Sequence, residues 1–167
     1  THAADMLLFL ASDSDVDYVQ GDVNIDDNDF EDNRTQVDPS ITMGYIQFRN
    51  GVRGISIPGS AYEFEVNCSN GVIRSLNNGL DFQLRKKHGK FNEILDTNFP
   101  NYEHKSGTVG CIADIVEAID TERETKGNIR LARISTEITL GIVESQRQKG
   151  TRIYMPMGNR SLYLGQW

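Results

Sequence analysis

The sequence lacks the features that mark several classes of protein. Its 167 residues contain no apolar run of the roughly 18 to 20 residues that a membrane-spanning helix needs. Basic residues are in the minority, with 17 Lys and Arg against 24 Asp and Glu, and a net charge of -7 repels nucleic-acid phosphates and anionic lipid heads. We therefore expect neither a membrane nor a nucleic acid as a partner.

The sequence also offers little for binding a metal. Cys68 and Cys111 lie far apart, without a Cys-x-x-Cys pair or a neighbouring histidine, so neither a zinc site nor a redox motif is indicated. We expect both thiols to be reduced and buried, as in a cytoplasmic protein. Asp27, Asp29 and Glu31 alternate as calcium ligands would, but the loop lacks the required glycine, which favours a solvated loop and no metal site.

Common cofactor and nucleophile motifs are missing as well. There is no Gly-x-Gly-x-x-Gly fingerprint, no Gly-x-x-x-x-Gly-Lys phosphate loop and no serine in a nucleophile elbow. A dinucleotide site needs a glycine turn that leads into a helix N-terminus, so we expect this chain alone to bind neither NAD nor NADP. The residues by themselves thus indicate no self-contained catalytic signature.

The middle of the sequence predicts a mainly antiparallel sheet. Residues 16–23 read as a strand, and residues 41–57 as two strands joined at Asn50-Gly51, a dipeptide typical of tight hairpin turns. Alternating apolar and polar residues predict three more strands, joined by turns at 69–71 and 77–79. By contrast, the Asp-rich segment 22–38 and residues 87–105 are predicted to be loops.

Three segments with helical spacing accompany these strands. "THAADMLLFL" reads as a helix, and apolar stripes recur in two later helices at Val109, Ile112, Val116 and Ile119, and at Leu131, Ile134, Ile138, Ile142 and Ser145. Short strands in "TRIYMP" and "SLYLG" close the chain. The expected fold is α+β: an open-faced, mainly antiparallel β-sheet with helices packed on one face, in a single domain over residues 1–167.

His2 and Asp5 share one face at the start of the first helix, because positions three apart on a helix are neighbours. The pair could form a site, or Asp5 could complement the positive helix N-terminus with His2 as a surface residue. Two other histidines, His88 and His104, fall in the predicted loop. Strand residues such as Tyr45, Arg49 and Arg53 are expected to pack, and none is assigned to a site.

Two stretches, 37 residues together, resemble a known family. "THAADMLLFL" resembles the Gly-x-His-x-x-Asp-Leu segment that opens the C-terminal domain of the Gfo/Idh/MocA oxidoreductases. "RLARISTEITLGIVESQRQKGTRIYMP" resembles the last long helix of that domain and the strand that follows it. The order of the elements also fits, and it implies the glyceraldehyde-3-phosphate dehydrogenase-like C-terminal fold.

The resemblance implies a role for the chain. In this family a Rossmann domain precedes the histidine helix, so the chain is expected to be the substrate-binding and oligomerisation domain of a longer enzyme whose cofactor domain is absent here. NAD or NADP would serve the intact parent, and the substrate would be a sugar, inositol or similar polyol. By its place in the motif, His2 matches the histidine that acts in proton transfer, and Asp5 matches the aspartate that hydrogen-bonds substrate hydroxyls. An imidazole suits proton transfer because the ordinary pKa of this group lies near neutrality.

Two further expectations concern partners. Family members commonly bury the exposed sheet face against another subunit, which implies a homodimer or homotetramer here. The alternative is a stand-alone, non-catalytic ligand-binding or scaffold domain of the same fold. A reading frame that continues upstream of Thr1 into a glycine-rich strand-turn-helix would favour the enzyme.

Overall fold

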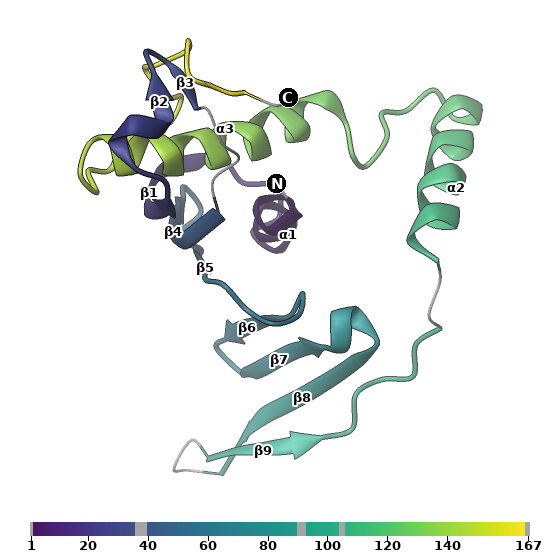
Figure 1. The fold of residues 1–167 in the computed structure, drawn as a ribbon. Helices are drawn as coiled ribbons and strands as arrows, with labels where there is room; N and C mark the ends of the chain where they lie inside the picture. The colour runs from purple at the N-terminus through teal and green to yellow at the C-terminus, as the bar shows by residue number, and fades with distance from the viewer. Residues whose placement is uncertain (1, 36–39, 90–92, 104–105, 166–167) are drawn as a thin grey trace. The chain divides into compact units, whose positions relative to one another are not determined.

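The computed structural model describes residues 2–35, 40–89, 93–103 and 106–165. The chain divides into two compact units, the first formed by residues 1–58 with 127–167 and the second by residues 59–126 (Figure 1). The fold is α+β with open, mainly antiparallel sheets, as the sequence predicts. That the whole chain forms one domain stays a prediction.

The first unit is built on a four-stranded antiparallel sheet in the order β10-β1-β4-β5. These strands comprise β1 (Val16–Asn24), β4 (Ser40–Phe48), β5 (Arg53–Ser56) and β10 (Ile153–Tyr154). The hairpin between β4 and β5 turns at Gly51, whose φ of 90° lies in the left-handed region that glycine tolerates best. The predicted strand at 16–23 and the predicted hairpin are confirmed.

Two helices cover one face of this sheet, as predicted. Helix α3 (Ile129–Arg147) packs over β1 and β4, and Leu7 of helix α1 (His2–Leu10) lies over Gly54 of β5. The predicted stripe of α3 is buried except for Leu131, which is partly buried. It joins inward side chains of the sheet and of α1 in the hydrophobic core, which includes Leu8, Val19, Ile46, Phe48, Ile138 and Ile142. This core cluster belongs to the first unit.

Gly21 and Gly44, which pair across β1 and β4, let α3 approach the sheet closely. Ile142 lies against both glycines, and a Cβ atom at Gly44 would be only 2.9 Å from its Cδ1 atom. Ser145 strengthens the contact, because its hydroxyl accepts a hydrogen bond from the backbone N–H of Gly21 at 3.0 Å and donates one to the carbonyl of Thr151 at 2.9 Å. The position of α3 is thus fixed by polar as well as apolar contacts.

A small three-stranded sheet corrects part of the sequence prediction. Within the Asp-rich segment predicted to be a loop, the structure forms the short helix η1 (Asp27–Asp29) and strands β2 (Phe30–Glu31) and β3 (Arg34–Thr35). The C-terminal strand β11 (Tyr163–Leu164) pairs with β3 in parallel. Strand β3 pairs with a strand more than a hundred residues away, which local composition does not reveal.

The second unit holds an antiparallel sheet in the order β6-β7-β8-β9. The strands of this sheet are β6 (Phe64–Cys68), β7 (Gly71–Leu76), β8 (Asp81–His88) and β9 (Glu93–Thr97). The unit also contains the short helix η2 (Asn77–Gly79) and helix α2 (Gly107–Asp120). Both turns predicted from glycine and asparagine are confirmed. The loop prediction for residues 87–105 is wrong in part, because β8 extends to His88 and β9 pairs with it; His104 lies outside the described residues.

Exposed side chains in the second unit overturn two expectations. Helix α2 forms as predicted, but its apolar stripe is exposed, and only Ala118 of this helix is buried. Both thiols were expected to be buried, but Cys111 on α2 and Cys68 at the end of the edge strand β6 are exposed and free.

No helix in the described ranges is long and apolar enough to cross a membrane.

Candidate functional site

The face of helix α1 that carries His2 and Asp5 is directed to solvent. His2, Asp5 and Phe9 are all exposed, and the side chain of Phe9 is 70% exposed, whereas Ala4 and Leu8 on the opposite side are buried. The expected placement of His2 and Asp5 on one helix face is therefore observed, and Phe9 lies exposed one turn further along the helix. The catalytic and substrate-binding roles of His2 and Asp5 stay predictions.

Neither His2 nor Asp5 lines the cavity of the first unit that includes Asp15 in its wall, which we call the Asp15 cavity. This cavity has a volume of about 230 Å³. It lies between the first half of α3, the start of β1, the β4–β5 turn and the segment after β10. Its walls combine four charged residues (Asp15, Arg49, Arg133 and Glu137) with the apolar residues Val16, Ile134, Ile138, Met155 and Pro156.

Glu137 is the most constrained charged residue of this region, with only 9% of its surface exposed. Its Oε1 atom accepts a hydrogen bond from the backbone N–H of Met157 at 2.7 Å and forms an ion pair with Arg160 Nη1 at 2.9 Å. Its Oε2 atom accepts from Arg133 Nη1 at 2.8 Å. Because the buried carboxylate is paired with two guanidinium groups, it holds Arg133 in a defined position at the cavity wall.

Sequence reasoning missed this cavity and Glu137. One signal was available, since Arg133 and Glu137 are four residues apart on a helix, the spacing of a surface ion pair. Nothing local marks Arg160 or the backbone N–H of Met157 as partners. A second cavity, of about 300 Å³ and with a more apolar lining that includes Ala132, shares Arg133 and Glu137 with the first.

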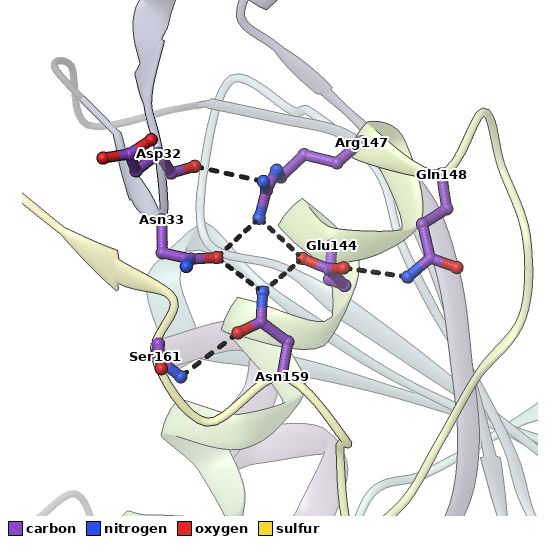
Figure 2. Close-up of polar contacts among 7 residues, drawn as sticks. All are labelled: Asp32, Asn33, Glu144, Arg147, Gln148, Asn159 and Ser161. Carbon is purple, nitrogen blue, oxygen red and sulfur yellow. Dashed lines mark hydrogen bonds and ion pairs between the residues drawn. The ribbon is translucent and has the colours of Figure 1, made fainter.

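A second buried carboxylate, Glu144, organises a structural network (Figure 2). It accepts hydrogen bonds from Arg147 at 3.1 Å, Asn159 at 3.2 Å and Gln148 at 2.8 Å. Asn33 accepts from both Arg147 and Asn159, at 3.3 and 3.0 Å. This network connects the β2–β3 turn and the segment before β11 to the end of α3, so we assign a structural role to it.

The outer face of the four-stranded sheet carries a tyrosine cluster. Tyr18 stacks on Tyr45 with ring centroids 5.8 Å apart and lies 5.7 Å from Tyr154, and the guanidinium of Arg152 sits 4.6 Å above the Tyr18 ring. Partial burial and a hydrogen bond with Tyr45 raise the pKa of Tyr18, while Arg152 opposes the shift. Tyr45 therefore packs as expected, although Arg53 on the same face is exposed.

Among the residues that the structure describes, no group of three or more His, Cys, Asp or Glu side chains could hold a metal ion. A dinucleotide would need a glycine-rich turn before a helix, and the sequence contains none.

Comparison with known proteins finds a similar fold but no related sequence. No family model matches the chain, and no curated protein matches it. Its fold resembles the crystal structure of a "putative NADPH-dependent oxidoreductase" from Desulfitobacterium hafniense DCB-2, with a TM-score of 0.62 and 16% sequence identity. The match covers 92% of this chain and 45% of that chain, so the chain spans less than half the length of that protein. The chain thus shares its fold with part of that protein.

Proposed function

We propose that this chain is the substrate-binding and oligomerisation domain of a nicotinamide-dependent oxidoreductase of the Gfo/Idh/MocA type, acting on a sugar, inositol or similar polyol. The observation that carries the proposal is the combination of a shared fold over 92% of the chain with a histidine helix at its start. His2 and Asp5 are exposed on that helix, so both are accessible to a substrate.

In the proposed reaction His2 acts on the hydroxyl group that is oxidised. A neutral imidazole nitrogen accepts the hydroxyl proton, and the resulting imidazolium returns it in the reverse direction. Asp5, one helical turn further on, accepts hydrogen bonds from neighbouring hydroxyl groups and fixes the orientation of the substrate. When bound, NAD or NADP supplies the hydride acceptor; its contacts are proposed to lie on a cofactor domain outside these 167 residues.

The outer sheet face is the proposed surface for a second copy, giving a homodimer or homotetramer in the cytoplasm. Tyrosine and arginine are enriched at the centres of protein interfaces, and Tyr18, Tyr154 and Arg152 bring both types together. Replacing Tyr154 by Glu should shift light scattering from the oligomer to the monomer. Tyr163→Glu, at an exposed tyrosine on β11, should leave the mass unchanged; equal effects of the two variants would contradict this surface.

Steady-state kinetics test the enzymatic proposal. The native gene product is assayed for reduction of NAD and of NADP with a panel of inositols, aldoses and linear polyols. Asp5→Asn should mainly raise KM for the preferred substrate, because Asp5 is proposed to orient hydroxyls in ground and transition state alike. If the folded protein binds one of the polyols but reduces neither NAD nor NADP with any of them, the stand-alone binding domain would be favoured instead.

A further inference from the structure

The Asp15 cavity contains two opposite charges for which the described residues provide no ion pair. Asp15 and Arg49 are both exposed, and neither side chain takes part in an ion pair with another described residue. Both nevertheless line the same cavity of about 230 Å³. By contrast, the carboxylate of Glu137 is already paired with Arg133 and Arg160.

Backbone contacts hold these two residues in place. The backbone N–H of Arg49 donates to the carbonyl of Asp15 at 2.9 Å, next to the pairing of Val16 with Phe48. The side-chain amide of Asn50 donates to the carbonyl of Ala11 at 2.8 Å and so ties the β4–β5 turn to the end of α1. The backbone around both charges is therefore supported by regular structure, which favours a preorganised site.

The remaining walls define what else a ligand needs. Arg133 is held by Glu137 through one of its nitrogens, so other guanidinium N–H groups remain available. Val16, Ile134 and Ile138 contribute buried apolar side chains. The four charged wall residues cancel, two positive and two negative, so the site as a whole does not select a strongly anionic or cationic ligand.

We propose that the Asp15 cavity binds a small zwitterionic amino acid with an apolar side chain. The ligand carboxylate pairs with Arg49 and Arg133, its ammonium group with Asp15, and its side chain with the apolar wall formed in part by Ile134. The volume lies below the roughly 300 to 1,000 Å³ of sites for drug-sized ligands, which suits a molecule of this size. This site does not involve His2 or Asp5, so it is independent of the function proposed above.

Calorimetric titration of the chain with L-leucine tests the proposal. We expect saturable binding at one site, and weaker binding of 4-methylpentanoate, which lacks the ammonium, and of 3-methylbutylamine, which lacks the carboxylate. Each analogue loses charge-assisted hydrogen bonds, so each should bind at least about tenfold more weakly than leucine. Equal binding of 4-methylpentanoate and leucine would overturn the role of Asp15.

Matched variants connect the binding to the named residues. Arg49→Gln and Asp15→Asn should each weaken leucine binding about tenfold or more, whereas Arg53→Gln and Asp13→Asn, at exposed positions outside the cavity lining, should not. Asp15→Asn should leave the weak binding of 4-methylpentanoate unchanged. Absence of saturable leucine binding by the folded wild-type chain, or equal losses in the cavity and control variants, would overturn the proposal.

Discussion

Substituting Gly21 by Ala tests how closely strand β1 pairs with β4 beneath helix α3. A Cβ atom at this position would lie 2.1 Å from the carbonyl oxygen of Met43 and 3.0 Å from Cα of Gly44. Both are backbone atoms of the neighbouring strand, so the clash cannot be relieved by rotating a side chain. Separating β1 from β4 would also strain the hydrogen bond between Gly21 and Ser145.

The expected cost follows from these contacts. Overpacking a core costs about 1 to 3 kcal/mol, and a lost buried hydrogen bond about 1 kcal/mol, so Gly21→Ala should lower the free energy of unfolding by about 3 kcal/mol or more. At Gly44 the nearest atom is the flexible end of Ile142, at 2.9 Å, and about 1 kcal/mol is expected. A Cβ at Gly158 would meet open space, so Gly158→Ala should be neutral or slightly stabilising.

Urea unfolding monitored by circular dichroism measures all three variants under the same conditions. Gly158→Ala should be the most stable variant, Gly44→Ala the next and Gly21→Ala the least stable. The largest difference in the free energy of unfolding should lie between Gly44→Ala and Gly21→Ala. If Gly21→Ala unfolds at the same urea concentration as Gly44→Ala, the close pairing of β1 and β4 described here is wrong.

Three further predictions concern charged and reactive side chains. Glu137→Gln should lower the free energy of unfolding, measured in urea, by about 2 kcal/mol, which is less than for a fully buried pair because the arginine partners of Glu137 are exposed. The control Glu122→Gln, at an exposed position, should not change the free energy of unfolding. Equal urea midpoints for the two variants would refute the role of Glu137. The backbone N–H of Lys126 and the guanidinium of Arg123 lower the pKa of Asp114. The contribution of this carboxylate to the stability of the fold is therefore present above the unfolded-state pKa of about 3.9 and is lost as the pH falls through the lower, folded-state pKa. Asp114→Asn should therefore weaken the loss of helical signal in acid, and an unchanged acid profile would contradict this. Both cysteines are exposed and should react with a thiol reagent without denaturant; a thiol that reacts only in denaturant would be buried after all.

Elements with a strong local pattern could be predicted from the sequence. The apolar stripe from Ile134 to Ile142 is sufficient to define α3 and its buried face, because helical periodicity and burial share one cause. Asn50-Gly51 likewise predicts its hairpin, since the turn conformation is a property of these two residues. The alignment of His2 with Asp5 on one face follows from helical geometry, whereas its exposure is seen only in the structure.

Features with a weak local pattern, or with surroundings that only the folded chain supplies, could not be predicted. Strand β9 has little apolar character, and its pairing with β8 is supported by the contact between Arg85 and Asp96. The partners of Glu137 are Arg133, one turn before it on α3, and Met157 and Arg160 in the segment after β10, which reaches Glu137 only in the folded chain. The periodicity of α2 predicts a helix with an apolar stripe, but not whether that stripe is covered.

Turnover by His2→Ala in the native gene product tests the central claim most directly. A general base contributes about 10²- to 10⁴-fold to the rate, so kcat for polyol oxidation should fall by that order while cofactor affinity stays nearly unchanged. The pH–rate profile should lose the limb near neutrality that an imidazole provides. The control His88→Ala, at an exposed histidine on β8, should retain wild-type kcat and pH dependence. Turnover by His2→Ala within a factor of about three of wild type would show that His2 is only a surface residue at the start of α1.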